Sequence, residues 1–193
     1  MSPNRAVAGG LFLLAVLIWA WLLTLWTHEL GHVIGALLTG STVQRVVLHP
    51  FAFSRTDVHP VHSPLVVVWA GPIGGCVFGA LVSLLLAALR RQMLTAALLT
   101  GGICWLVNAV YIGVGAAVPI ADARAMVDLG SPRWMLAAFG LVAGIPGYFL
   151  VRNGIARLRI HLEADGRFSM ESAVVAVGAC ALAAAGLIFF PGP

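Results

Sequence analysis

The chain consists largely of long apolar segments separated by short polar ones. A helix that crosses a membrane needs about 20 mostly apolar residues. Five segments meet this requirement at least approximately, and they cover residues 6–38, 65–89, 93–120, 134–151 and 172–191. Lipid offers the backbone no hydrogen-bond partners, so membrane-spanning segments form helices or closed barrels, and long uninterrupted runs favour helices. The pattern predicts an all-α polytopic membrane protein with about five transmembrane helices.

Two stretches between these segments have a different pattern. Residues 42–63 alternate Val43, Arg45 and Val47 and contain His-Pro steps, which is typical of a short β-hairpin. Open sheet edges do not persist in lipid, so we expect the hairpin at the membrane interface or sheltered by protein. Residues 152–171 place four arginines and three acidic residues among apolar positions. They predict an amphipathic segment on the membrane surface.

The composition agrees with a membrane protein. Hydrophobic residues make up 61% of the chain and charged residues 9%, whereas soluble domains carry about 25% charged residues. All eleven basic residues are arginines scattered between the apolar segments, so we expect no nucleic-acid partner. The three cysteines lie in three different apolar segments and are expected to be packing residues. We expect one membrane domain over residues 1–193, multi-pass in a bacterial cytoplasmic membrane.

One short motif interrupts the first apolar segment, where residues 28–32 read His-Glu-Leu-Gly-His. Helical positions i and i+4 share a face, so His28 and His32 can direct their ring nitrogens to one metal ion. Glu29 lies beside the first ligand, where it can act as the general base for a zinc-bound water. A charged side chain at the bilayer centre costs roughly 2.5–3.5 kcal/mol on insertion scales and therefore indicates function. We expect this segment to be retained rather than cleaved as a signal peptide, since cleavage would remove the motif.

A catalytic zinc needs a third protein ligand and an open fourth position. By residue type the candidates are Asp57, Asp122, Asp128, Glu163, Asp165, Glu171, His49, His59, His62 and His161. The first and third of five spans run in the same direction, and the motif lies in the C-terminal half of the first. The third ligand is therefore expected near the C-terminal end of the third span, where Asp122 follows Pro119. The alternative for Asp122 is an interfacial ion pair with Arg124.

Asn108 and a glycine stripe are the other notable features of the apolar segments. A buried Asn in a membrane helix can hydrogen-bond a neighbouring helix. It can equally bind a substrate backbone or a developing oxyanion, and the pattern around Asn108 favours neither role. Gly71, Gly75 and Gly79 recur at every fourth position. Such a stripe predicts close packing of another helix.

These features resemble the M50, or site-2, family of intramembrane zinc metalloproteases, over roughly residues 15–125. The resemblance rests on the motif at residues 28–32, the hairpin after it, Ala70-Gly-Pro-Ile-Gly-Gly75 at the start of the next span, Asn108 and Asp122. The usual family pattern is Asn-x-x-Pro-x-x-x-x-Asp-Gly, whereas here Asn108 and Asp122 are 14 positions apart. The triplet at residues 121–123, Ala-Asp-Ala, is most similar to the M50B-like branch.

The resemblance implies a core of three helices around Zn²⁺, held by His28, His32 and Asp122. It also implies that the hairpin offers an edge strand to an extended substrate. The implied function is hydrolysis of peptide bonds in membrane-protein substrates by zinc-activated water, with Glu29 as general base. The alternative is a non-catalytic zinc-binding membrane protein that acts as a partner-binding or assembly factor.

Overall fold

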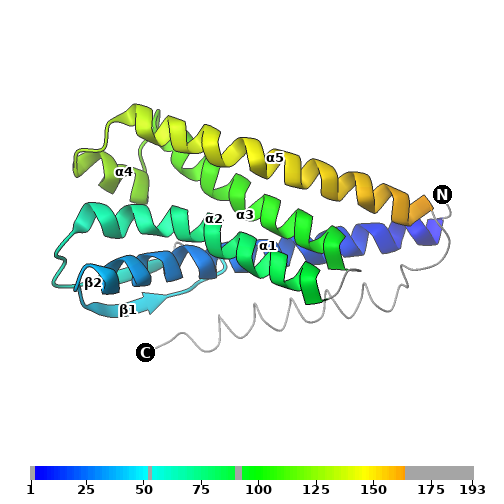
Figure 1. The fold of residues 1–193 in the computed structure, drawn as a ribbon, viewed down its shortest axis with the longest axis horizontal. Coiled ribbons are helices and arrows are strands. Elements are labelled where there is room, and N and C mark those ends of the chain that lie inside the picture. Colours follow the sequence, from blue (N-terminus) through cyan, green and yellow to red (C-terminus); the bar gives the residue numbers. More distant parts are fainter. Residues whose placement is uncertain (1–2, 52–53, 90–92, 164–193) are drawn as a thin grey trace.

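The computed structural model describes residues 3–51, 54–89 and 93–163. These form α1 (Pro3–Leu38), β1 (Val43–Val47), β2 (Arg55–Val58), α2 (Pro64–Leu89), α3 (Leu94–Gly115), α4 (Ala121–Asp128) and α5 (Arg133–Glu163). The predicted span at residues 172–191 and the amphipathic residues 164–171 lie outside the described residues. Within the described ranges the fold is helical apart from one antiparallel strand pair (Figure 1), which confirms the all-α polytopic architecture.

Four described helices are long and apolar enough to cross a membrane. They are Ala6–Leu38, Pro64–Leu89, Leu94–Gly115 and Arg133–Glu163. Two boundaries differ from the predicted ones. The third helix ends at Gly115 rather than at residue 120, and α4 follows the turn before Ala121. The fourth continues past residue 151 to Glu163, because residues 152–163 contain no proline that would end a helix.

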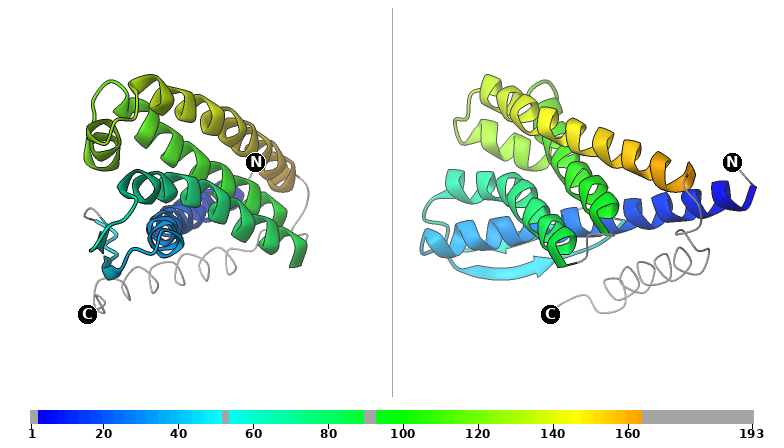
Figure 2. Two further views of the ribbon diagram at one scale, coloured as in Figure 1. Left: turned by 60° about the vertical axis from the view of Figure 1, so that its left-hand side comes forward. Right: turned by 45° about the vertical axis from the view of Figure 1, so that its right-hand side comes forward.

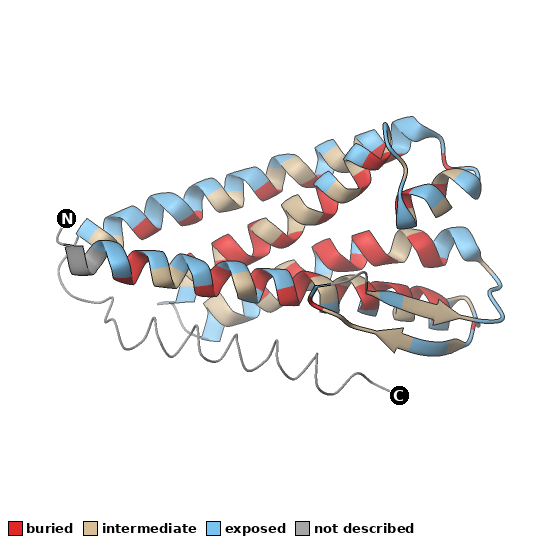
Figure 3. Ribbon diagram, turned by 180° about the vertical axis from the view of Figure 1, so that it is seen from behind, coloured by how far each residue is buried: buried red, intermediate tan, exposed pale blue. Residues whose placement is uncertain are grey.

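The helices form a bundle in which α2 lies against both α1 and α3, while α5 runs along α3. The short α4 and the hairpin both lie near the end of the bundle where α1 terminates and α2 begins (Figure 2). Buried residues gather on the faces of α1, α2 and α3 that look toward one another, and exposed residues cover the outer faces (Figure 3). Many of those exposed residues are large and apolar, as expected for helix faces that contact lipid.

The glycine stripe of α2 packs closely against neighbouring helices, as predicted, since a Cβ at Gly71, Gly75 or Gly79 would overlap a side chain of α1 or α3. Close backbone contact between α1 and α2 involves two further glycines, Gly31 and Gly74. A Cβ atom at Gly31, inside the motif, would overlap the carbonyl group of Ala70 on α2. A Cβ atom at Gly74 would lie 2.5 Å from the Cα of Gly31. The motif glycine and the glycines of α2 therefore allow the two backbones to touch, which brings the motif face of α1 against α2.

A small apolar cluster fixes α4 against the bundle. Its buried members come from α2, α3, α4 and α5, and they are Val68, Ile112, Ala123, Met126 and Leu136. Trp69 supports the same region, since its indole Nε1 donates a hydrogen bond to Ser131 Oγ at 3.0 Å. Packing of these side chains places the start of α4 against the face of α1 that carries His28 and His32.

The hairpin pairs β1 with β2 in antiparallel register, with Val46 opposite Thr56 and an irregularity between Val43 and Arg45. It lies within the predicted residues 42–63. The loop between its strands is attached to α1, because Trp21 Nε1 donates a hydrogen bond to the Pro50 carbonyl at 2.9 Å. The strand pair is thus held beside α1 by protein contacts, as a sheet edge near lipid requires.

We predict that Gly31→Ala lowers the free energy of unfolding, because the new methyl group must push Ala70 and the α2 backbone away. Overpacking of this kind costs about 1–3 kcal/mol. The measurement is thermal unfolding of the purified protein in detergent micelles. Gly10→Ala on the same helix is the control, since a Cβ there meets no described atom within 4 Å. Equal unfolding midpoints for the two variants would contradict the prediction.

Candidate metal centre

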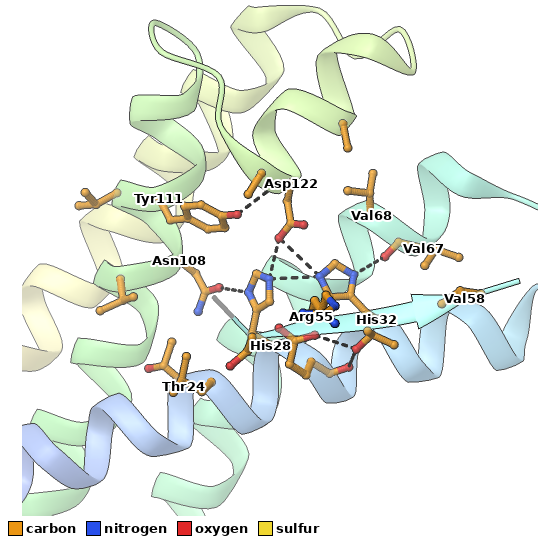
Figure 4. A pocket seen from close by; sticks show the side chains of 18 of the residues that line it. Thr24, His28, His32, Arg55, Val58, Val67, Val68, Asn108, Tyr111 and Asp122 are labelled. Atoms are coloured by element: carbon orange, nitrogen blue, oxygen red, sulfur yellow. Dashed lines mark hydrogen bonds and ion pairs between the residues drawn. The ribbon is translucent and has the colours of Figure 1, made fainter. Parts of the chain in front are cut away.

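Side chains from α1, α3 and α4 meet at one point inside the bundle (Figure 4). His28, Glu29 and His32 come from α1, Asn108 comes from α3, and Asp122 comes from the first turn of α4. His28 and His32 point to the same side of α1, as their spacing of four predicts. Their ring centroids are 4.9 Å apart.

Three potential ligand atoms form a small triangle. His28 Nε2 lies 2.8 Å from Asp122 Oδ2 and 3.2 Å from His32 Nε2. The third side, from His32 Nε2 to Asp122 Oδ2, is 3.5 Å. Ligand atoms that surround a tetrahedral Zn²⁺ at about 2.0–2.1 Å are about 3.3 Å from one another. The triangle therefore has the dimensions of one face of a tetrahedral zinc site.

The hydrogen bonds on the far side of each ring determine where its proton lies. His32 Nδ1 is 2.8 Å from the Val67 carbonyl oxygen, and a carbonyl oxygen only accepts. His28 Nδ1 is 2.9 Å from Asn108 Oδ1, and Asn108 Nδ2 in turn donates to the Cys104 carbonyl at 2.9 Å. The amide is thus oriented with its oxygen toward His28. Both rings consequently donate through Nδ1, and in the neutral form both Nε2 atoms carry lone pairs.

The consequence is that three electron-pair acceptors face one another with no donor between them. Two neutral imidazole Nε2 atoms and a carboxylate oxygen at 2.8–3.5 Å repel one another unless a proton or a metal cation lies among them. Two nitrogen ligands with one oxygen ligand suit Zn²⁺. In the part of the chain that the structure describes, this is the one group of three such side chains close enough to hold a metal ion.

The turn that precedes α4 positions Asp122. Ala121 has φ of 44°, in the left-handed region that residues with a Cβ rarely adopt. The Asp122 backbone N–H donates to the Tyr111 hydroxyl at 3.1 Å, which attaches the turn to α3. Arg124 forms its ion pair with Asp128 at 2.9 Å. The alternative role of Asp122, a pair with Arg124, is therefore not the one observed.

The histidines control the ionisation of Asp122. Burial by itself would raise the pKa of this carboxyl group, but in the absence of a metal ion a proton carried on Nε2 of His28 or His32 is donated to Asp122, outweighs burial and leaves the pKa well below its usual value. Asp122 is thus a carboxylate, the form that binds a metal ion.

Glu29 projects beside the triangle and is held by the hairpin. Its side chain is buried, and its Oε2 accepts a hydrogen bond of 2.7 Å from Thr56 Oγ1 on β2. Thr56 Oγ1 also lies 3.5 Å from the Glu29 carbonyl oxygen. The hairpin therefore contacts the carboxylate that the motif marks as a base.

A cavity of about 1250 Å³ opens onto these side chains. Its wall is mostly apolar and draws on all three core helices. Strand β2 contributes Arg55, Thr56 and Val58, whereas no residue of β1 lines it. The space is large enough for several residues of an extended peptide, and β2 lies along one side of it.

The remaining predicted candidates lie apart from the triangle. The His49 ring packs against Phe51 and accepts a hydrogen bond from its backbone N–H, so it serves its own loop. His161 contacts the Arg157 carbonyl on α5. Asp57 pairs with Arg55 on the exposed side of β2. Glu163, His59 and His62 belong to no described group of metal-ligand side chains, while Asp165 and Glu171 are outside the described residues.

Three contributors to the site were not predicted from the sequence: Thr56, Tyr111 and the Val67 carbonyl. The alternation in the hairpin marks Thr56 as a strand residue, but no local signal connects it with Glu29, 27 positions earlier. Tyr111 and Val67 belong to apolar spans and have no distinguishing pattern. Only the packing of the helices reveals their contacts.

Comparison with known proteins identifies one matching family. A family model described as Peptidase M50B-like matches residues 6–118, more than half of the chain. The match includes the motif, the hairpin and Asn108, and it ends before Asp122. No curated protein and no solved structure matches the chain.

We predict that zinc raises the thermal unfolding midpoint, because an ion between the three acceptors binds only the folded state. Free zinc at 100 times its Kd would stabilise the protein by about 2.7 kcal/mol. The measurement is unfolding in detergent with zinc and with a chelator. Asp122→Ala should lose the zinc effect, whereas Asp128→Ala, on the exposed side of the same helix, should keep it. A midpoint that does not respond to zinc in the unaltered protein would contradict the prediction.

Proposed function

The chain belongs to the Peptidase M50B-like family, and on that premise we propose that it is a zinc-dependent peptidase that cleaves membrane-protein substrates within the bilayer. The observation that carries the proposal is the convergence of two imidazole Nε2 atoms and one carboxylate beside Glu29. This convergence lies on helices with the length and composition of membrane spans. Peptide-bond hydrolysis at such a site needs a metal, a base and an opening for the peptide; the chain offers a group of side chains that could hold the metal, a carboxylate beside them and a cavity.

We assign the metal to His28, His32 and Asp122. When bound, zinc would polarise the scissile carbonyl group and lower the pKa of water towards about 7. Three protein ligands would leave a fourth position for water or substrate, as in catalytic rather than structural zinc sites. Asn108 and the Val67 carbonyl, which contact the far side of the two imidazole rings, would then also influence catalysis, because they determine which ring nitrogen is free to bind the metal.

Glu29 is the proposed general base. Its carboxylate takes a proton from the attacking water as the water oxygen bonds to the scissile carbonyl carbon. The same proton is then delivered to the amide nitrogen as the C–N bond breaks, which leaves a carboxylic acid and an amine. The hydrogen bond from Thr56 occupies Oε2 and fixes the direction of the carboxylate. Thr56 therefore acts as a positioning residue for the base.

The substrate is proposed to lie along β2. This strand, unlike β1, faces the cavity. A peptide added to a strand is extended, and an extended backbone exposes its carbonyl groups for attack, which a helical one does not. The apolar wall of the cavity suits the side chains of a membrane-spanning segment.

We predict that Glu29→Gln retains zinc and loses cleavage, since the amide keeps the shape of the side chain but cannot accept the proton. General-base catalysis contributes about 10²–10⁴-fold, so a rate loss of that size is expected. The measurements are metal content of the purified protein and cleavage of a quenched fluorescent peptide built on an apolar single-span segment.

The same experiment separates the two candidate functions. Equal cleavage by Glu29→Gln and the unaltered protein would sink the peptidase proposal. Zinc binding without cleavage of any single-span peptide by the unaltered protein would favour the non-catalytic alternative, a zinc-binding factor that binds or assembles a membrane partner.

We predict that Thr56→Val lowers the rate of cleavage by about 10- to 100-fold, because a hydrogen bond to a charged group is worth about 1.5–3 kcal/mol. Zinc content should not change, since Thr56 contacts no ligand of the proposed zinc site. Thr56→Ser restores the hydroxyl and should restore the rate. A Thr56→Ser rate as low as that of Thr56→Val would indicate that Thr56 contributes strand packing rather than its hydroxyl group.

A further inference from the structure

We infer that Asn108 is a positioning residue for the proposed metal centre: it holds the His28 ring so that Nε2 would face the ion. The absence of a side chain at Gly75 leaves room for the Asn108 amide. The inference rests on the proposed zinc site, and it deepens that proposal by naming what determines its affinity. It assigns Asn108 a role different from direct contact with substrate.

The contacts of Asn108 leave its amide group a single orientation. Asn108 is 1% exposed. Its Nδ2 donates to the Cys104 carbonyl one turn earlier on α3, at 2.9 Å. Its Oδ1 consequently faces His28 Nδ1, also at 2.9 Å. A flipped amide would place Nδ2 against His28 and two oxygens against each other at Cys104, so the observed orientation is the one that satisfies both contacts.

This orientation determines the tautomer of His28. An amide oxygen accepts and does not donate, so His28 keeps its proton on Nδ1 and its lone pair on Nε2. Nε2 is the atom that faces His32 and Asp122. Without the acceptor at Asn108, the ring loses the bond that fixes its rotation and its proton. Loss of such an outer contact typically costs 10–100-fold in metal affinity.

Gly75 on α2 leaves the space that the Asn108 amide occupies. The three atoms nearest to a Cβ built at Gly75 all belong to the Asn108 amide, and they lie within 2.8 Å. A methyl group there would displace the amide. At Gly79, one turn further along the same stripe, the nearest atoms belong instead to Cys104. The stripe thus has a member that directly contacts the Asn108 amide and a neighbour that contacts the Cys104 side chain instead.

Both heteroatoms of the amide therefore contact protein. One of the two Nδ2 hydrogens is donated to the α3 backbone, so a substrate-binding or oxyanion role would depend on the second Nδ2 hydrogen alone. Asn108 would therefore affect the proposed reaction through its hydrogen bond with His28.

The first test measures zinc affinity with a chromophoric chelator as competitor, in the full chain in detergent. Asn108→Leu removes the acceptor at similar volume and should weaken zinc binding 10–100-fold. Asn108→Asp retains an oxygen facing His28 Nδ1 but sets its second oxygen against the Cys104 carbonyl, so it should bind zinc more tightly than Asn108→Leu and more weakly than the unaltered protein. Thr100→Val, which removes a buried polar group from α3 two turns earlier, is the control and should change nothing. The absorption spectrum of the Co²⁺-loaded protein should change in Asn108→Leu and not in Asn108→Asp.

The second test compares two glycines of one stripe. Gly75→Ala and Gly79→Ala both add a methyl group to a tightly packed face of α2, so both should lower thermal stability. Only Gly75→Ala should weaken zinc binding, and by an amount comparable to Asn108→Leu. This pair keeps the inference testable even if Asn108→Leu does not fold.

Failure of the inference is distinct from failure of the zinc proposal. If the unaltered protein binds zinc and Asn108→Leu binds it equally well, the positioning role is wrong while the zinc site stands. Equal losses of affinity in Gly75→Ala and Gly79→Ala, or no rescue by Asn108→Asp, would likewise overturn it. If the unaltered protein binds no zinc, the metal centre itself is wrong.

Discussion

The structure depends on one electrostatic constraint, which is that three lone-pair acceptors meet inside an apolar bundle. The two Nε2 atoms and the Asp122 carboxylate lie 2.8–3.5 Å apart, and in a region of low dielectric such groups are costly unless a cation joins them. Each ligand is then fixed from behind by a separate contact: Asn108 for His28, the Val67 carbonyl for His32, and the α3–α4 turn for Asp122. The proposed metal would thus also link α1 to α4, and the contacts behind its ligands would extend that link to α2 and α3.

The glycines explain how apolar helices come close enough for this. Membrane helices gain no hydrophobic free energy by leaving lipid for one another, so close van der Waals contact and hydrogen bonds hold them together. Contact between Gly31 and the α2 backbone brings α1 and α2 together, and Gly71 leaves space for the His32 ring, which a Cβ there would overlap. Replacing these glycines by alanine would therefore move the proposed metal ligands apart. Packing and chemistry share the same residues at this interface.

The hairpin connects the cavity to Glu29, the proposed base. Thr56 lies on the strand that faces the cavity and donates directly to Glu29. A peptide that pairs with this strand would lie next to the residue that orients the carboxylate. In the proposed peptidase, binding of an extended segment and alignment of the base thus involve one strand, attached to α1 through Trp21 and Pro50.

The sequence by itself determined the features that depend on local periodicity. Apolar runs longer than a bilayer crossing predicted the spans, i and i+4 spacing put His28 and His32 on one face, and chain direction placed Asp122 near them. The metal and catalytic roles of these residues stay predictions, although the three side chains do lie together. Only the tertiary structure decided the contacts of Asn108, Thr56, Tyr111 and the Val67 carbonyl. These pairs are 11 to 80 positions apart. Which side chains meet over such separations depends on helix rotation and crossing, and no local pattern records those.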